Sequence, residues 1–350
     1  MEHGIIHMLL FNKKDRKIIY MKDKLMWFWE KFGFAIGLIV TVVVLNIRLP
    51  YVVYTPGNTI SLNDRINIKD SNDMEGSFNA VSVLMRYGNL PNLLMSFVVP
   101  NWDLVPYEEI KSDDVSMKEM FERDRILMDN SVNNAAFAVF DLLNIPYEID
   151  EELYVVLQSR SDSNILVGDH LLEVEGKKVT DLDMFLDIIN TKKIGDEIEV
   201  LVLRDDKEVL VDGELFDIGK EAKLGISIAT LYDYASDVVI DFESDKNESG
   251  PSAGLMMALT MYNMIEDKDI TYGKKIVGTG TIDKDGVVGD IGGVKYKLLG
   301  AVKDDAELFI CPSGNYEEAM EVKKDNDLDI DIIKATTLES VIKQLEELYE

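Results

Sequence analysis

The residues of this chain that could do chemistry together lie in three short motifs of its C-terminal half. They are Gly250-Pro-Ser-Ala-Gly254, Gly278-Thr-Gly-Thr281 and Ile291-Gly-Gly-Val-Lys-Tyr-Lys297. A serine hydroxyl becomes a good nucleophile when a neighbouring base accepts its proton. A lysine can be that base if burial or a nearby positive dipole lowers its pKa. The first hypothesis is therefore a hydrolytic site that combines a serine with a lysine.

Other kinds of hydrolytic site find few suitable residues. The chain has 3 histidines, and His3 and His7 precede an apolar segment, which leaves only His170 for a Ser-His-Asp triad. With Cys311 as the single cysteine, the scattered histidines are too few for a zinc site of the His/Cys type. Cys311 itself is better explained as a buried thiol at a strand end. No G-x-x-x-x-G-K-S/T loop occurs, so we do not expect an ATPase module. We also expect no bound metal or cofactor.

The serine motif has the composition of a junction between a loop and a helix. Proline suits the first turn of a helix and serine caps one, so Pro251 and Ser252 are expected to open a buried helix over residues 253–265. Ser252 would then point at free backbone N–H groups and at the positive end of the helix. That environment suits an oxyanion.

The lysine candidates follow a predicted hairpin. Residues 275–282 and 287–291 are predicted strands joined by residues 283–286, and Gly292-Gly293 then begins a helix that runs to about residue 306. Lys297 would lie near the N-terminus of this helix, where the dipole disfavours the protonated amine. On a helical wheel, however, Lys295 is nearer the centre of the apolar arc and Lys297 is at its edge. The residues alone leave both lysines as candidates.

The two outer motifs, in this order and at this separation, resemble the proteolytic domain of Lon proteases. The resemblance covers about residues 224–350 and implies that Ser252 is the nucleophile and Lys297, the second lysine of its motif, is the base. It also implies that Thr279 hydrogen-bonds the catalytic lysine, with Gly250 and Pro251 as supporting residues of the serine motif. Ser249 departs from the pattern, because many Lon domains have aspartate or glycine there.

Composition narrows the classes of partner. The 350 residues suffice for two or three domains, and the net charge of −29 argues against nucleic-acid binding. A single cysteine excludes an intramolecular disulfide framework.

The N-terminal residues carry a net positive charge, whereas the chain as a whole is acidic. Residues 1–31 are basic, and an uncharged segment follows between Lys31 and Arg48, with Trp27 and Trp29 just before it. As a helix, that segment rises about 24 Å, somewhat less than the roughly 30 Å core of a bilayer, and flanking residues can supply the rest. We interpret residues 32–49 as a transmembrane anchor with a cytoplasmic N-terminus. A buried core helix or a cleaved signal peptide is the alternative, and Met21 is a second candidate start.

Residues 50–150 give the weakest signals. Pro56-Gly57 indicates a turn, residues 81–85 a strand and residues 130–143 a helix. An acidic run is more typical of a solvated face than of a metal site; it comprises Asp113, Asp114, Glu119, Glu122 and Asp124.

Residues 151–216 predict a small β-rich module. Strands are expected at residues 153–157, on both sides of a Glu175-Gly176 turn, and at residues 197–204 and 208–211, with a helix over residues 181–190. This order resembles a PDZ domain of bacterial proteases, which can capture an extended peptide on a sheet edge. No clear Gly-Leu-Gly-Phe-type loop lies near Leu153, so regulation or packing is an equally supported role for the module.

Residues 217–350 alternate strands and helices, with strands at 309–311 and 329–333 and a helix at 337–349, which predicts an α/β or α+β proteolytic domain. The expected fold class is thus mixed α/β: a basic tail (1–31), a transmembrane helix (32–49), an extracellular region (50–150), a PDZ-like module (151–216) and a Lon-like domain (217–350).

This domain order resembles the membrane-anchored, PDZ-containing, Lon-type proteases of Gram-positive bacteria. The resemblance implies an ATP-independent endopeptidase on the outer face of the cell membrane. Its expected partners are a peptide or unfolded protein substrate, the lipid bilayer and, as an open question, a second copy of the chain. In that mechanism backbone N–H groups near Gly250 and Ser252 hold the oxyanion. Two alternatives remain: a PDZ-type adaptor with a decayed protease domain, and a serine–lysine amidohydrolase that acts on a non-peptide amide.

Overall fold

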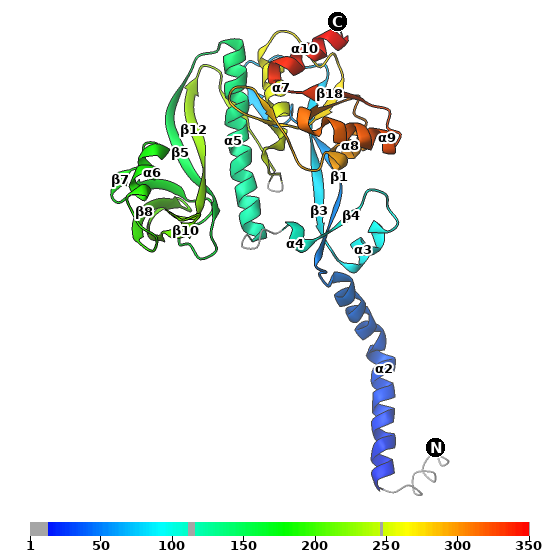
Figure 1. Cartoon of the computed structure of the whole chain (residues 1–350). Helices are drawn as coiled ribbons and strands as arrows, with labels where there is room; N and C mark the ends of the chain where they lie inside the picture. Colours follow the sequence, from blue (N-terminus) through cyan, green and yellow to red (C-terminus); the bar gives the residue numbers. More distant parts are fainter. Residues whose placement is uncertain (1–12, 111–115, 246–247, 350) are drawn as a thin grey trace. The chain divides into compact units, whose positions relative to one another are not determined.

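The protein is described by a computed structural model of residues 13–110, 116–245 and 248–349. It divides into two compact units, one made of residues 1–53 and 85–107 and the other of residues 54–84 and 108–350. His3, His7, Asp113 and Asp114 of the sequence predictions lie outside the described residues. The mixed α/β class expected from the sequence is confirmed (Figure 1).

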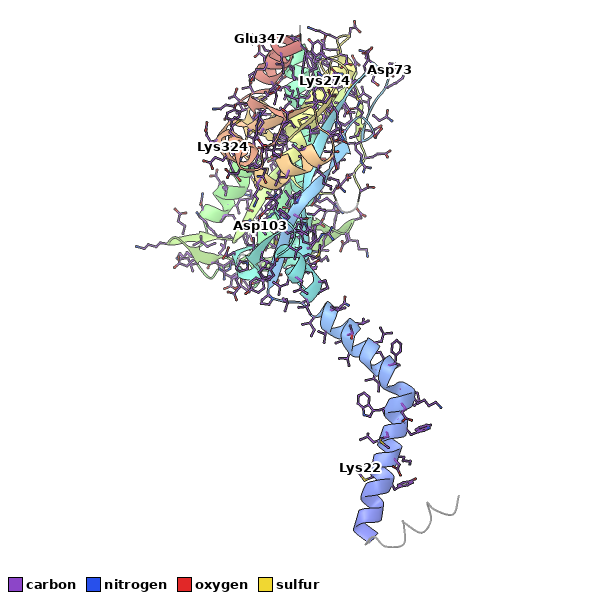
Figure 2. All side chains as sticks on the ribbon, turned by 90° about the vertical axis from the view of Figure 1, so that its right-hand side faces the viewer. Lys22, Asp73, Asp103, Lys274, Lys324 and Glu347 are labelled. Carbon is purple, nitrogen blue, oxygen red and sulfur yellow. The ribbon has the colours of Figure 1, made fainter. Side chains whose placement is uncertain are left out.

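The first unit contains the long helix α2 (Lys13–Asn46), the short helix α3 (Leu90–Ser96) and strand β4 (Asp103–Pro106). Within the described residues, α2 is the helix long and apolar enough to cross a membrane, over Tyr20–Asn46. From Tyr20 onward its side chains are mostly exposed, as Figure 2 shows for Lys22. The helix therefore begins well before the predicted anchor of residues 32–49, and an N-terminal apolar helix of this kind fits a membrane anchor or a signal sequence.

A mainly parallel sheet forms the centre of the second unit, with the strand order β18-β17-β14-β3-β1. Its strands are β1 (Tyr51–Ser61), β3 (Ser77–Tyr87), β14 (Lys275–Gly278), β17 (Leu308–Pro312) and β18 (Asp331–Ala335), and β14 pairs in parallel with both β3 and β17. The first residues of β1 and the last of β3 belong to the first unit, where β4 continues the sheet beside β1.

Both faces of this sheet are buried, which explains the continuous apolar runs of β14 and β17. Successive residues alternate between two cores: Leu308 and Ile310 pack on one face, and Phe309 and Cys311 on the other. The first core lies under α5 (Met117–Leu143), α7 (Gly254–Ile265) and α10 (Leu338–Tyr349), and the second under α8 (Val294–Lys303) and α9 (Tyr316–Asp325) (Figure 1).

The predicted strand over residues 275–282 is wrong as one element, because the chain leaves the sheet at Thr279. β14 ends at Gly278, and Thr281–Ile282 (β15) pairs with Val288–Gly289 (β16) as a separate hairpin. At the break, the Thr279 N–H donates to Ile310 O and the Gly280 N–H donates to Ser252 O. The Thr279 N–H thus still bonds β17, whereas the Gly280 N–H is turned toward the serine motif.

The turn predicted at Pro56-Gly57 is also wrong, since both residues lie inside β1. A Cβ on Gly57 would lie 2.2 Å from the carbonyl oxygen of Ser82. The glycine therefore permits close approach between backbones within the sheet, and it does not serve to reverse the chain.

The second sheet has the strand order β12-β5-β6-β8-β9, and β7 (Lys177–Lys178) pairs with β6. Its elements are β5 (Tyr147–Ser159), β6 (His170–Val174), α6 (Leu182–Asn190), β8 (Glu197–Arg204), β9 (Lys207–Glu214) and β12 (Ile226–Ser236). A core of its own, which includes Val156, Phe185 and Val200, lies within this module. The strands and helix predicted for the PDZ-like module are present, and β12 adds a strand beside β5.

Helix α5 is about twice as long as its predicted part, residues 130–143. A reciprocal capping box opens it: the Ser116 hydroxyl accepts from the Glu119 N–H, and the Glu119 carboxylate accepts from the Ser116 N–H. The S-x-x-E spacing is a known start signal, but the charged residues that follow it hide the helical apolar period. Short elements complete the unit: β2 (Ile66–Ile68) with β13 (Ile240–Phe242), β10 (Phe216–Ile218) with β11 (Glu221–Lys223), α4 (Tyr107–Ile110) and a turn at Ser313–Asn315.

Candidate active site

Ser252 lies in a one-turn 3-10 helix, Pro251–Ala253, that leads directly into α7. Pro251 occupies the first turn, where a missing N–H costs no hydrogen bond. Gly250 precedes it with φ +102° and ψ 150°, a conformation that side chains other than glycine rarely adopt. The expected junction of loop and helix is thus present, with Gly250 supplying the bend that turns Ser252 into place. We call residues 248–253 the Ser252 turn.

Lys297 lies in the first turns of α8, which starts at Gly293 with φ +72°. Although lysine is usually solvated, the Lys297 side chain is only 4% exposed. Its Nζ is 2.6 Å from Ser252 Oγ and 2.9 Å from Thr279 Oγ1. The structure therefore brings together the serine, the lysine and the threonine that the sequence singled out.

Thr279 holds both partners in this arrangement. It is fully buried at the point where the chain leaves β14, and its hydroxyl donates to the Ser252 carbonyl oxygen over 2.9 Å. Because that proton is used, Thr279 Oγ1 faces Lys297 Nζ as an acceptor. One hydroxyl thus connects the backbone of the serine to the head group of the lysine.

Burial lowers the pKa of Lys297 to about 8. Desolvation disfavours the charged ammonium, and the hydroxyl groups of Ser252 and Thr279 carry no charge that would offset it. About a tenth of the amine is therefore neutral at pH 7, far more than for an ordinary lysine. A neutral amine at this distance can accept the proton of Ser252 Oγ.

Lys295, the other candidate, lies outside this arrangement. It is partly exposed, and its Nζ lies over the ring of Tyr296 at 5.5 Å from the centroid. The helical wheel misplaced the buried face of α8, because it gave full weight to Leu299 and Val302, which are only partly buried. The face that packs inward is made of Val294, Lys297, Leu298 and Ala301.

The remaining nucleophile and base candidates are also elsewhere. His170 begins β6 and pairs with Val155 and Leu203 in the PDZ-like sheet. Cys311 is fully buried in β17, and burial raises the pKa of its thiol to about 12, so it is not a reactive thiolate. In the described parts of the chain, no group of three or more His, Cys, Asp or Glu side chains could hold a metal ion.

Helix α5 contacts the Ser252 turn directly, a role that the sequence did not indicate. The Gly250 N–H donates to the Asp124 carbonyl oxygen over 2.9 Å, and Ser131 Oγ donates to the Pro251 carbonyl oxygen over 3.2 Å. The Gly250 N–H is thus occupied in this conformation, contrary to the expectation that it faces an oxyanion. The Ser252 N–H, at the start of a helix, belongs to the donors without an intrahelical acceptor.

The other end of the Ser252 turn is held by an arginine from a distant part of the chain. Arg65 Nη2 lies 2.8 Å from Glu248 Oε1 and 2.6 Å from Asp245 Oδ2. The Glu248 carboxylate also accepts from the Asp245 N–H. No local pattern could have pointed to Arg65, because the pair is formed by tertiary structure alone.

No clear peptide-binding loop is predicted near Leu153, and the strand at that position does not lie at the edge of the sheet. Leu153 lies in β5, which pairs with β12 on one side and with β6 on the other, so the edge strands of this sheet are β12 and β9. Leu224-Gly225-Ile226 leads into β12, with Gly225 at φ +67°, and its residue types resemble those of a Gly-Leu-Gly-Phe-type loop. α5 covers part of that edge, since Asn130 Nδ2 donates to Thr230 O and the Tyr232 N–H donates to Asn133 Oδ1.

Comparison with protein families identifies two domains in the chain. Residues 186–347 match the model of the Lon protease (S16) C-terminal proteolytic domain, and residues 150–215 match the PDZ domain model. The chain therefore carries a Lon-type serine protease domain together with a PDZ domain.

Similar proteins include Lon proteases. The chain is 31% identical over 159 residues to Lon protease of Lachnoclostridium phytofermentans, an alignment that covers 42% of this chain and 19% of the relative. It is 33% identical over 96 residues to the peroxisomal Lon protease homolog 2 of Caenorhabditis elegans, covering 27% of this chain and 12% of the relative. Thus the chain spans less than a fifth of the length of either relative.

Among solved structures, PDZ domains of SdrC-like proteins are similar to part of the chain. The domain from Listeria monocytogenes is 25% identical and covers 21% of this chain and 85% of its own, with a TM-score of 0.21. The one from Listeria innocua is 26% identical and covers 22% and 92%, also with a TM-score of 0.21. The PDZ assignment rests on the family model.

Proposed function

Starting from a chain with a Lon-type proteolytic domain and a PDZ domain, we propose that it is an ATP-independent, membrane-anchored endopeptidase with a Ser252–Lys297 dyad. Its substrates are extracytoplasmic peptides or unfolded protein segments. The observation that carries the proposal is the 2.6 Å contact between Ser252 Oγ and the buried Nζ of Lys297, whose pKa is lowered to about 8. The intact contact favours an active enzyme over an adaptor with a decayed protease domain.

In the proposed mechanism, neutral Lys297 accepts the proton of Ser252 Oγ as the oxygen attacks the scissile carbonyl. The lysine ammonium then gives that proton to the leaving amine, and an acyl-enzyme remains on Ser252. A water molecule, deprotonated by Lys297, releases the acid product. Thr279 keeps Nζ directed at Ser252 through both steps, because its hydroxyl holds the serine backbone and the amine together.

The oxyanion requires backbone donors at the start of α7. The Ser252 N–H is one candidate. The Gly250 N–H becomes the second only after it leaves the Asp124 carbonyl oxygen, to which it donates in this conformation. We therefore propose that productive substrate binding shifts the Ser252 turn relative to α5.

The cellular placement follows from α2. An apolar helix over Tyr20–Asn46 with basic residues before it is oriented with its N-terminus in the cytoplasm and the two folded modules outside. We propose the domain boundaries as residues 1–31, 32–49, 50–150, 151–216 and 217–350. Because the sequence contains no Walker-type phosphate loop, unfolding of stable substrates is not expected.

The test is cleavage of casein and of a peptide library by the full chain in detergent, without ATP. Ser252→Ala and Lys297→Ala should abolish cleavage, whereas Lys295→Ala should retain it. Loss of cleavage with Lys295→Ala alone would contradict the choice of base. Folded protein that neither cleaves peptides nor reacts with a serine-directed fluorophosphonate probe would support the adaptor; a reactive serine without peptide cleavage would support the non-peptide amidohydrolase.

A further inference from the structure

The first unit exposes a group of large apolar side chains next to the end of α2. Phe97 and Val98 are 75% and 78% exposed, and Leu94 and Met95 are 57% and 43% exposed. We call these four residues the α3 patch. Single exposed apolar residues are ordinary, but four within five positions form a contiguous surface, which marks an interaction site.

Local hydrogen bonds hold the backbone of the α3 patch in a fixed conformation. Asn89 caps α3 by accepting from the Asn92 N–H, and Pro91 occupies the first turn. At the other end, the Phe97 N–H donates to Leu94 O, and both the Val98 and Val99 N–H groups donate to Met95 O. Both ends of α3 are therefore closed, so the apolar side chains are displayed by an ordered turn.

The α3 patch belongs to the same unit as α2 and adjoins its C-terminal end. α3 contacts α2, and the connecting chain is closed by hydrogen bonds from Leu49 N to Gly88 O and from Gly88 N to Tyr51 O. Figure 1 shows α3 and β4 gathered where α2 ends. If α2 crosses a bilayer, this end is where the chain leaves the lipid.

Aromatic and cationic side chains accompany the patch. The Arg48 guanidinium lies 4.5 Å from the ring centroid of Tyr87, and that of Arg86 lies 5.7 Å from the ring centroid of Trp102. Tyrosine and tryptophan favour the headgroup level of a bilayer, and arginine beside them can meet lipid phosphate. A surface for another protein would not need this pairing of an aromatic belt with an adjoining apolar helix.

The sequence around α3 has no charged residues, which also favours contact with lipid. In a chain with 29% charged residues, the segment between Arg86 and Asp103 contains none. A segment of this composition can enter the boundary between headgroups and acyl chains without desolvating an ionised side chain.

We propose that the α3 patch inserts into the outer-leaflet headgroup boundary of the bilayer, as a second membrane contact beside α2. The occupant of this surface is phospholipid. The inference rests on the proposed membrane anchoring, and it adds that the first unit is held against the membrane surface at two places, so that it cannot swing freely about the end of α2.

The test uses the full chain in liposomes and tryptophan quenching by brominated phosphatidylcholine. The 3 natural tryptophans, Trp27, Trp29 and Trp102, are replaced by phenylalanine, and Phe97→Trp places a single reporter in the α3 patch. The matched control is Leu210→Trp in the same background, because Leu210 is 58% exposed on β9 of the PDZ-like sheet. A Trp102→Phe chain that keeps Trp27 and Trp29 reports separately on α2.

The expected result is blue-shifted Phe97→Trp emission, quenched several-fold more strongly by lipid brominated near the headgroup than by lipid brominated near the chain ends. Leu210→Trp emission should be neither shifted nor quenched. Quenched Trp27 and Trp29 together with an unquenched Phe97→Trp would overturn this inference and leave the anchor standing. No quenching of Trp27 and Trp29 would overturn the anchor and the inference together. Blue-shifted but unquenched Phe97→Trp would mean that protein, such as a second copy, covers the patch, which also overturns it.

Discussion

The two helix starts that meet at the site, those of α7 and α8, are built alike and held differently. Gly293 directly precedes α8, and Gly250 precedes the 3-10 turn that leads into α7; both glycines have positive φ, and neither helix start has a side-chain cap. At α8 the sheet core encloses the start and leaves Lys297 only 4% exposed. At α7 the start is partly exposed and is held by groups from outside: α5 and Arg65. The difference teaches that the proposed base is placed by packing, whereas the proposed nucleophile is placed by a few polar contacts that can change.

The largest effect on kcat is expected when alanine replaces Gly250, and the same replacement at Gly293 is the comparison. Gly250→Ala forces a side chain into φ +102°, where strain of about 1–3 kcal/mol displaces the Ser252 turn. We expect kcat to fall by about 100-fold, since a small misplacement at a reacting atom is costly. Gly293→Ala, at φ +72°, should cost about 1 kcal/mol of folding stability and change kcat only a few-fold. Peptide cleavage and chemical denaturation measure both. An equal loss of kcat in the two variants would contradict the proposed difference in how the two helix starts are held.

The pH dependence of activity tests the proposed base, Lys297, at the buried start of α8. Lys297 acts as a base when neutral, and its pKa is lowered to about 8, so activity rises with pH through that value. Between pH 6 and pH 8, kcat/KM should increase about 50-fold, following the neutral fraction of the amine. A lysine with an ordinary pKa near 10.4 would instead give a rise that continues past pH 9. Serine labelling at each pH measures the same midpoint without peptide binding.

Removing the hydroxyl that joins the two helix starts should have an intermediate effect. Thr279→Val keeps the shape of the side chain but deletes its hydrogen bonds to Lys297 Nζ and Ser252 O. We expect about a tenfold loss of kcat, with KM little changed. Thr279→Ser restores the hydroxyl and should recover most of the activity. A loss that Thr279→Ser does not recover would indicate a packing role instead.

The smallest effect is expected at the surface support of the Ser252 turn. Arg65→Met removes the ion pairs to Asp245 and Glu248, and partly exposed pairs contribute about 1 kcal/mol or less. We expect kcat to fall about threefold, while the midpoint of the pH profile stays unchanged because Lys297 is not affected. Arg125→Met, which removes a long and exposed pair to Glu122, is the control and should leave kcat unaltered. A shifted midpoint in Arg65→Met would show that the two helix starts are coupled.

The sequence predicted those parts of the site that depend on local pattern. Ser252 follows from its motif and α7 from its apolar run, whereas the choice of Lys297 and the role of Thr279 came from the resemblance to Lon proteases. The residues alone could not rank Lys295 against Lys297, because a helical wheel assumes one apolar face, while the buried face of α8 is defined by what packs on it. The turn predicted at Gly57 was wrong for a similar reason. This glycine lets the backbone pass close to Ser82, a contact that is visible only in the folded sheet. The contact of Asp124 with Gly250 uses a backbone carbonyl, which leaves no trace in residue types.

Strand β12 has a consequence for how such chains can evolve. It pairs with β5 from Ile226 opposite Ser159 to Ser236 opposite Tyr147, and it also lies within the residues matched to the Lon-type domain. Deletion of the whole PDZ domain, including β5, would leave one edge of β12 unpaired, and an unpaired strand edge favours aggregation. The PDZ domain and the proteolytic domain are therefore not independently replaceable at the junction formed by β5 and β12. Substitutions in β5 and β12 are expected to be inherited as matched sets.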